Sequence, residues 1–393
     1  MTAVTSQPHA FTRSDRSRMG LWWWTVDHWL LGATAFLIAA GVVLSFTSSP
    51  AEAARLHIAD PFHFAIRQSL FGLGAAAVVM SVSLLSARAV RRAALIIYGL
   101  TILMMLALPA FGHSAKGAAR WIEVSGFSLQ PSEFMKPALI VLCGWMFAEG
   151  QKGEGVPGVS IAFALYGLSV VLLLIEPDVG QTILITIAFG AAFFMAGVPI
   201  RWILGLGGAA LAGIVTIYFT FQHVAMRVHS FLGSGAEDGG HQVDKALAAI
   251  RAGGLLGRGP GEGIVKRQVP DGFTDFIYAL AAEEYGLVLS LTLIAVLGFV
   301  VIRGLYKAMR LQDAYEQVAA AGLFVLVGQQ AFINVAVNLK MIPTKGMTLP
   351  FISYGGSSML AMALTLGFAM ALTRRRPGVY VSGPLVAPAG QFG

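Results

Sequence analysis

Most of the chain consists of apolar blocks, each long enough to cross the roughly 30 Å of hydrocarbon in a lipid bilayer. The 393 residues contain ten such blocks, near 29–47, 64–84, 92–111, 133–149, 157–175, 180–197, 201–221, 276–302, 316–339 and 350–373. The blocks are continuously apolar, whereas the strands of a β-barrel would alternate with period two. We therefore predict an all-α polytopic membrane protein with about ten transmembrane helices.

The composition supports this prediction. Only 12% of the residues are charged and the mean hydropathy is +0.72, whereas a soluble protein of this size carries about 25% charged residues. We expect one membrane domain at 29–373, with tails at 1–28 and 374–393 and no separate soluble domain. The only cysteine, Cys143, lies inside a predicted span, so no intrachain disulfide is possible.

The basic residues predict the orientation, because cytoplasmic loops of membrane proteins are enriched in Arg and Lys. Cations cluster on one side of the predicted topology, which places both termini in the cytoplasm. The cluster Trp22-Trp23-Trp24 before the first span is typical of an anchor at the membrane interface. The cations on that side are Arg13, Arg16, Arg18, Arg88, Arg91, Arg92, Arg201, Arg303, Lys307, Arg310, Arg374, Arg375 and Arg376.

A large extracytoplasmic loop is predicted at 223–275, between the seventh and eighth spans. It is basic, although it lies on the side where the rule disfavours cations. Either long loops escape the rule, or the cations meet an anionic ligand, and we favour the ligand. The cations are Arg227, Lys245, Arg251, Arg258, Lys266 and Arg267.

The same loop contains the glycine-rich stretch RAGGLLGRGPGEG at 251–263. It lacks the Gly-Lys-Ser/Thr ending of a P-loop and follows no strand, so a nucleotide site is a poor interpretation. The glycines would let the backbone pass close to a ligand or bend tightly over the helix bundle. The histidines of this loop lack the spacing of a zinc site.

Several ionisable residues lie at membrane depth, where they usually face the bundle interior or a polar path. Glu133 and Lys136 share a helix face and can pair, and the sequence leaves structural and functional roles equally open. A structural role is favoured for the acidic residues at two further sites. These sites are the external turn with Glu176 and Asp178, and the pair Glu283 and Glu284.

Asp275 stands at the head of the apolar run in GFTDFIYALAAEEYG, residues 272–286. This is the place of a helix N-cap residue. A carboxylate there is stabilised as the anion by the helix dipole, so it could also accept a proton as a general base. The residues alone leave both roles open.

Five motifs occur in a characteristic order across the membrane region. They are GAARWIEVSGFSLQPSEFMK at 117–136, EPDVGQT at 176–182, HQVDKALAAIRAGGLLGRGPGEG at 241–263, TDFIYALAAEE at 274–284 and PTKGMTLPFISYGGSS at 343–358. With them the chain closely resembles the SEDS proteins (shape, elongation, division and sporulation), the family of FtsW, RodA and SpoVE. The PTKG form, with Lys345, is similar to the cell-division branch.

The resemblance implies a peptidoglycan glycosyltransferase that polymerises lipid II at the outer face of the inner membrane, at the division septum. It implies a class B penicillin-binding protein and other divisome proteins as partners, within membrane lipid and without nucleic acid. The family's essential acid falls on Asp275. The chain departs from the family at Phe273, where a histidine is common, and at Asp271, where a glutamate is common.

The implied reaction needs one base for the attacking sugar hydroxyl and cations for the departing pyrophosphate. A second carboxylic acid, as in a glycosidase, is unnecessary. No cofactor is certain, but a divalent cation, Mg²⁺ or Mn²⁺, could supply the same positive charge. The candidate substrate-binding residues are Arg227, Lys266, Arg267, Lys345, Glu133, Lys136 and Ser357.

Two alternatives remain from the sequence. A lipid II flippase would share the substrate but needs a polar path to the cytoplasmic side. A non-catalytic divisome scaffold would tolerate the loss of Asp275. The acids, glycines and surplus cations of this chain concentrate at the outer side, which favours the polymerase.

Overall fold

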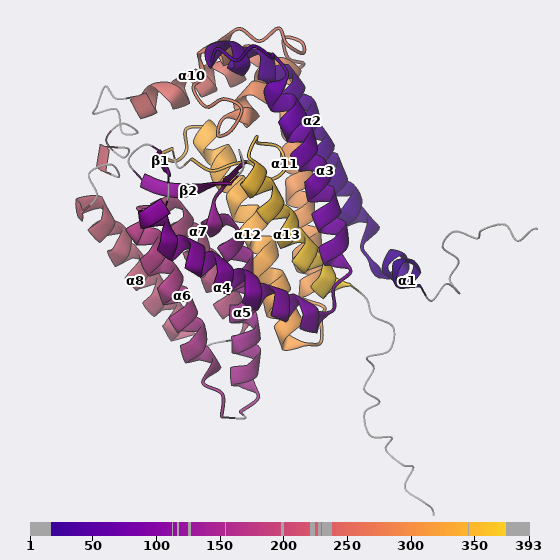
Figure 1. Cartoon of the computed structure of the whole chain (residues 1–393), viewed down its shortest axis with the longest axis vertical. Helices are drawn as coiled ribbons and strands as arrows, with labels where there is room; N and C mark the ends of the chain where they lie inside the picture. The colour runs from indigo at the N-terminus through magenta and orange to yellow at the C-terminus, as the bar shows by residue number, and fades with distance from the viewer. Residues whose placement is uncertain are drawn as a thin grey trace, which may run out of the picture.

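Long helices make up most of the computed structural model (Figure 1). It describes residues 17–111, 113–115, 118–124, 127–153, 155–197, 200–220, 225–226, 229, 238–344 and 346–374. The helices are α1 (Arg18–Thr25), α2 (His28–Arg55), α3 (His63–Ser83), α4 (Ala87–Phe111), α5 (Pro131–Gln151), α6 (Gly158–Ile175), α7 (Val179–Met195), α8 (Ile200–Thr220), α10 (Asp238–Gly253), η1 (Val265–Gln268), α11 (Ile277–Ala308), α12 (Ala314–Asn338) and α13 (Gly356–Thr373).

Each of the ten predicted spans coincides with one helix, α2 to α8 and α11 to α13. Seven helices of the described chain are long and apolar enough to cross a membrane by length and composition, namely α2, α3, α4, α6, α11, α12 and α13. The apolar helix α7 is shorter. The prediction of a helical polytopic membrane protein is therefore confirmed.

The helices α12 and α13 form the centre of the bundle, as Figure 1 shows. In their most apolar windows 78% and 83% of the residues are buried, against 28–33% in the other five helices that could span a membrane. Helix α13 packs on α3, and α12 packs on α5, α7 and α11. The other five helices therefore leave most of their apolar surface available for lipid.

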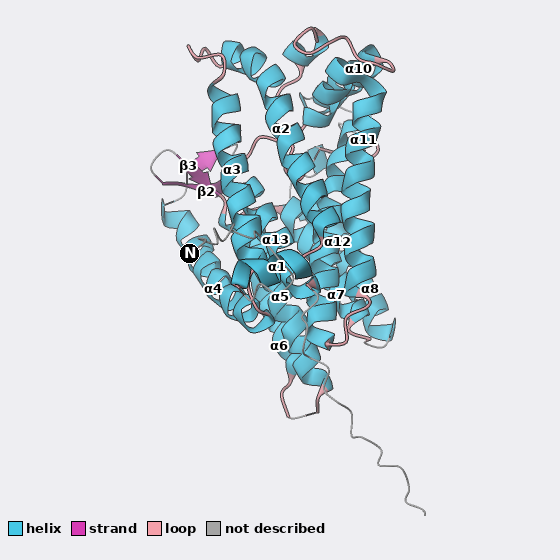
Figure 2. Ribbon diagram, turned by 90° about the vertical axis from the view of Figure 1, so that its right-hand side faces the viewer, coloured by secondary structure: helices cyan, strands magenta, loops and turns pink. Residues whose placement is uncertain are grey.

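The two ends of the described chain meet at one end of the bundle, here called the terminal end. The Trp22 indole N–H donates to Ser83 Oγ (2.9 Å), and Arg374 Nη1 donates to the Ser83 carbonyl (3.3 Å). The opposite end, here called the loop end, carries α10 (Figure 2), and η1 packs against α10. An even number of spans between the two termini accounts for this arrangement.

One acidic residue that sequence analysis did not single out fixes the terminal end. Asp27 caps α2 by accepting from the Leu30 N–H (3.0 Å). Its carboxylate also pairs with Arg303 (2.9 Å) and Lys307 (2.6 Å) of α11. Two cations that the positive-inside rule used as orientation signals therefore also tie α11 to the start of α2.

The connection between α4 and α5 contains strands, which an all-α prediction did not include. Strands β1 (His113–Ala115), β2 (Ala118–Val124) and β3 (Phe127–Leu129) form an antiparallel sheet in the order β1-β2-β3. Ile122 lies opposite Leu129. Strands β1 and β3 have only three residues each, and the seven residues of β2, AARWIEV, do not alternate strictly between apolar and polar, so the sequence carries no clear strand pattern here.

The glycine-rich stretch packs its backbone directly on α11. Arg258 N–H donates to the Glu283 carbonyl (2.9 Å), and Leu287 N–H donates to the Gly254 carbonyl (3.0 Å). These bonds form where α11 is broken at Gly286, whose φ is 75°. Of the two roles considered for the glycines, the structure supports the tight bend over the helix bundle.

Gly253 tests this close approach. A Cβ atom on Gly253 would lie 1.8 Å from the Ala282 carbonyl oxygen. Gly253→Ala must therefore displace backbone, and we expect a loss of about 1–3 kcal/mol in stability, measured as thermal unfolding in detergent. In Gly99→Ala of α4 the added methyl meets nothing within 4 Å, so this control should keep or raise the stability. Equal behaviour of the two variants would contradict the packing.

Candidate functional site

The backbone of Asp275 is held by the preceding loop and by α12. Its N–H donates to the Asp271 carbonyl (3.0 Å). Its carbonyl accepts from the side-chain amides of Asn334 (2.9 Å) and Asn338 (3.1 Å) on α12. These bonds fix the position of the residue before α11 begins.

Asp275 is not the N-cap of α11, which is one of the two roles that the sequence left open. The helix starts at Ile277, and its N-cap, Phe276, makes no side-chain capping bond. Asn338 Oδ1 instead accepts from the Ala279 N–H in the first turn (3.2 Å).

The Asp275 side chain is half-buried and lines a small pocket of about 20 Å³. Gln242 of α10, Asn334 of α12, and Thr344 and Gly346 of the loop after α12 also line it. A Cβ atom on Gly346 would lie 3.7 Å from Asp275 Oδ2, so this loop runs beside the carboxylate. A cavity of this volume holds about one water molecule, so a saccharide would require the pocket to widen.

Lys345, a candidate for pyrophosphate contact, lies outside the described residues. Its two neighbours, Thr344 and Gly346, both line the Asp275 pocket. Arg227, a second candidate, also lies outside the described residues. Arg267 is exposed in η1.

Three amide residues of α12 form a stripe that sequence analysis missed. Gln330, Asn334 and Asn338 follow one another at four-residue spacing and are 2%, 1% and 0% exposed. Gln330 Nε2 donates to the Thr348 carbonyl (3.2 Å), and Asn334 Nδ2 donates to the Met347 carbonyl (2.6 Å). The stripe thus joins Asp275 to the loop after α12. Amides at helical spacing inside an apolar span were the available signal.

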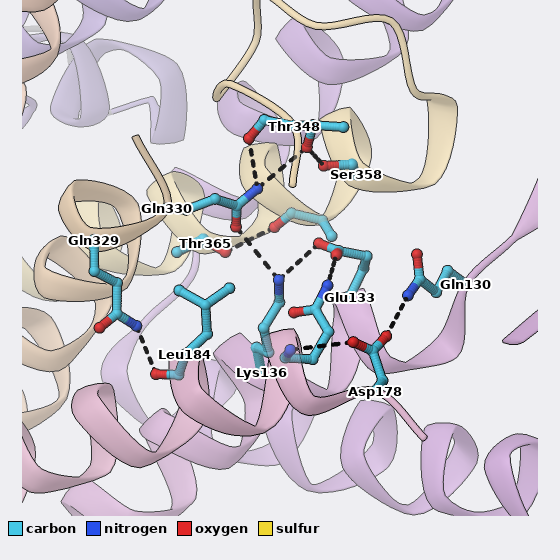
Figure 3. Close-up of polar contacts among 12 residues, drawn as sticks. Gln130, Glu133, Lys136, Asp178, Leu184, Gln329, Gln330, Thr348, Ser358 and Thr365 are labelled. Carbon is cyan, nitrogen blue, oxygen red and sulfur yellow. Dashed lines mark hydrogen bonds and ion pairs between the residues drawn. The ribbon is translucent and has the colours of Figure 1, made fainter. Parts of the chain in front are cut away.

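Glu133 and Lys136 form a buried ion pair in the same network (Figure 3). Lys136 Nζ lies 2.9 Å from Glu133 Oε2 and donates to Gln330 Oε1 (3.3 Å). Gln181 of α7 donates to the other Glu133 oxygen. The two residues are 4% and 2% exposed, so their contacts join α5, α7 and α12, and the expectation that they contact substrate stays a prediction.

Ser357, another candidate for substrate contact, lies in the first turn of α13 and is buried. Its neighbour Ser358 shares a hydrogen bond with the Thr348 hydroxyl (2.5 Å), as Figure 3 shows. This end of α13 is therefore linked through Thr348 to Gln330 and the amide stripe.

Lys266 is placed differently from the sequence-based expectation. Its ammonium forms a buried ion pair with Glu284 and donates to the Thr47 carbonyl of α2 (3.0 Å). The residue is 5% exposed. Because Glu284 already neutralises the ammonium in the interior, a contact between Lys266 and a pyrophosphate would require this ion pair to open.

Glu283 and Glu284 have structural roles, as favoured from the sequence. The Glu283 carboxylate accepts from the N–H groups of Ile264 (2.8 Å), Val265 (2.8 Å) and Lys266 (2.7 Å). Glu284 pairs with Lys266. One glutamate therefore holds the backbone of η1 and the other holds its lysine.

The turn between α6 and α7 contains a second group of buried acids. Asp178 caps α7 by accepting from the Gln181 N–H (3.2 Å). Arg120 lies 3.9 Å from Asp178 and donates to the Glu176 carbonyl (3.0 Å). Neither carboxylate oxygen of Glu176 has a hydrogen-bond partner among the described residues. Burial, aided by the charge of Asp178, raises the pKa of Glu176 to about 8.

Within the described ranges, no three His, Cys, Asp or Glu side chains gather in a way that could hold a metal ion. Asp275 is the one carboxylate among the described residues that line its pocket, and a single carboxylate can act as an acid or as a base.

The fold and the site together define a class: a multi-pass helical membrane protein with one pocket-lining carboxylate at its loop end, fixed by buried amides. Residues 28–377 match the family model described as cell cycle protein, FtsW/RodA/SpoVE. The chain belongs to this family.

Curated relatives match nearly the whole chain. A Caulobacter vibrioides protein named "Probable peptidoglycan glycosyltransferase FtsW" is 66% identical over 390 residues, covering 99% of this chain and 98% of the relative. A Hydrogenovibrio crunogenus protein of the same name is 35% identical over 367 residues, covering 89% and 91%.

Solved structures share the fold. A chain from a peptidoglycan synthase complex that coordinates polymerization and crosslinking matches with a TM-score of 0.72 and 25% identity, covering 88% of this chain and 97% of its own. The rod shape determining protein RodA of Thermus thermophilus matches with a TM-score of 0.65 and 25% identity, covering 89% and 97%.

The buried carboxyl of Glu176 makes stability depend on pH. Its pKa rises from an ordinary 4.5 to about 8, so the folded state binds the proton more tightly than the unfolded state. The contribution of protonated Glu176 to the free energy of unfolding is fully present below its ordinary pKa, and it is lost as the pH rises through about 8. We expect the melting temperature to fall between about pH 5 and pH 9, and to fall less in Glu176→Gln. The exposed Glu262→Gln is the control, and a Glu176→Gln profile identical to it would contradict this account.

Proposed function

We propose that this chain is a peptidoglycan glycosyltransferase that polymerises lipid II, with Asp275 as the general base. The observation that carries the proposal is the position of Asp275, held by α12 amides beside the loop that contains Lys345. The names of the relatives and the matching synthase complex support the same activity.

In the proposed step, the Asp275 carboxylate accepts the proton of the 4-hydroxyl of one saccharide. The hydroxyl oxygen attacks the anomeric carbon of the second saccharide, and the bond from that carbon to the undecaprenyl pyrophosphate breaks with inversion. A base is needed because a sugar hydroxyl is a weak nucleophile near neutral pH. Pyrophosphate already leaves readily when its charge is balanced, so one carboxylate suffices.

The charge of the leaving pyrophosphate requires cations near Asp275. We propose Lys345, Arg227 and Arg267 for this role. Lys266 is not retained, because its ammonium is committed to Glu284. A divalent cation, Mg²⁺ or Mn²⁺, remains a proposal and would be brought by the pyrophosphate oxygens, which are hard ligands that suit such ions.

The flippase alternative requires a polar path through the bundle, and the described interior does not favour one. The buried network around Lys136 lies near the loop end of α5, five residues after its first residue, Pro131. About 16 Å further along α5, the interior is filled by packed aromatic rings, with the Phe147 ring centroid 5.6 Å from that of Phe189 and 5.5 Å from that of Phe193. This apolar region favours a reaction confined to the loop end over transport of a polar headgroup through the bundle.

We further propose that the loop end faces outward, that both termini are cytoplasmic and that the protein acts at the division septum. A class B penicillin-binding protein and other divisome proteins are its proposed partners. Between α11 and α12 lies an apolar groove of about 330 Å³, lined by Ile294, Gly298, Ile302, Gly328 and Phe332 among others. Glycines let helices approach closely in membranes, so this groove suits the transmembrane helix of the penicillin-binding protein.

Asp275→Asn tests the proposed base. The amide keeps the size of the side chain but cannot accept the proton, so we expect polymerisation of lipid II to be lost while the melting temperature is retained. The assay measures glycan chains from purified protein, its penicillin-binding partner and lipid II. Asp244→Asn on α10 is the control, because this exposed carboxylate pairs only with Lys340 in the described contacts. Normal chain formation by Asp275→Asn would refute the base and leave the scaffold or flippase functions.

Asn334→Ala tests the positioning of that base. The variant removes the donor to the Asp275 and Met347 carbonyls, and a displaced catalytic group can cost about 100-fold in rate. We expect kcat to fall by roughly 10-fold or more with KM little changed. The control Gln329→Ala removes another α12 amide, which donates to the Leu184 carbonyl (2.6 Å) away from the site. It should lose stability but keep kcat, and equal kcat values in the two variants would argue against positioning.

A further inference from the structure

The tip of the glycine-rich loop presents leucines outward. Leu255 and Leu256 are 70% and 81% exposed, and Ile264 in the same segment is 62% exposed. Apolar side chains this exposed on a tightly folded loop are unusual unless another apolar surface covers them. Backbone hydrogen bonds between the loop and α11 place the tip beside this helix.

The depth of the tip follows from the helices to which it is bonded. The Leu255 carbonyl accepts from the Val288 N–H (3.3 Å). From Lys307, which pairs with Asp27 at the terminal end, an unbroken helix to Val288 rises about 28 Å at 1.5 Å per residue. This distance is close to the thickness of the hydrocarbon layer of a bilayer, about 30 Å. The leucines therefore lie at the level where the hydrocarbon ends on the loop side.

An independent path along α2 gives the same level. The ammonium of Lys266 donates to the Thr47 carbonyl of α2. Thr47 lies about 28 Å along this helix from His28 at the terminal end. Lys266 follows Ile264 by two residues, so the exposed isoleucine belongs to the same layer as the leucines.

The leucines continue the lipid-facing surface of α11. Next to them on that helix, Leu287 and Val288 are 44% and 58% exposed. Two cations, Arg258 and Arg267, are exposed in the same loop segment. Apolar groups bordered by arginines match a phospholipid surface, in which the phosphates lie directly above the acyl chains.

The loop is also rigid enough to act as a fixed wedge. Its backbone is bonded to α11 on both sides of Gly286, and Glu283 accepts the N–H groups of Ile264, Val265 and Lys266 at the start of η1. An ordered loop loses little further conformational entropy on contact with lipid.

We propose that Leu255, Leu256 and Ile264 insert into the acyl layer of the leaflet at the loop end, with Arg258 and Arg267 on its phosphates. The loop is thus a membrane contact in addition to the spanning helices. If Asp275 acts as proposed above, this contact also sets its height relative to the pyrophosphate of a lipid-linked substrate. That consequence rests on the proposed function, whereas the insertion does not.

Spin labelling of single residues tests the insertion. The only native cysteine, Cys143, is fully buried, so a nitroxide will label Leu256→Cys selectively in the full chain. In vesicles of phosphatidylethanolamine and phosphatidylglycerol, we expect the label at 256 to collide more with oxygen than with a water-soluble nickel chelate. The control is Glu262→Cys, an exposed polar position of the same loop, where we expect the reverse order.

Each outcome decides the proposal. Collisions at 256 dominated by the nickel chelate, as at 262, would place the tip in water and overturn it. Protection at 256 that occurs only after a penicillin-binding partner is added would also overturn it, because a protein surface would then cover the leucines. Neither measurement depends on glycan synthesis, so the insertion can fail while Asp275→Asn still behaves as expected.

Discussion

The candidate site depends on one stripe of amide side chains, Gln330, Asn334 and Asn338, on the central helix α12. In the interior of a membrane protein each unsatisfied polar group costs several kcal/mol, so buried amides strongly fix the groups with which they bond. Here they bond to the Asp275 carbonyl, to the loop after α12 and, through Gln330, to Lys136. A single face of one helix thereby sets the positions of α5, the loop and the carboxylate.

Buried ion pairs also fix how distant segments of the chain pack together. Lys136 is neutralised by Glu133 and Lys266 by Glu284, and both pairs join segments that are separate in the fold. Buried pairs contribute little net stability, but breaking one leaves an uncompensated charge. Glu176 differs, because none of the described residues forms a hydrogen bond with its carboxylate. Burial accordingly raises the pKa of Glu176 to about 8, so the fold favours the neutral form of this carboxyl.

The pocket at Asp275 has room for about one water molecule. In this structure the site is therefore closed to a saccharide. Gln242 of α10 and Gly346 of the loop after α12 line it from two sides. Both elements lie at the loop end, outside the packed centre of α12 and α13. Asn334 of the amide stripe lines the same pocket from the packed centre.

The ten spanning helices could be predicted from the sequence, because the length of an apolar block is a local property that can be compared directly with the thickness of the bilayer. It also identified Asp275 as the candidate base through its motif. The tertiary structure alone decided which polar groups are committed to partners. Lys266 and Glu284 are 18 residues apart, and Asn338 lies 63 residues from Asp275. Charge and spacing cannot predict such pairings, because they depend on how distant segments pack.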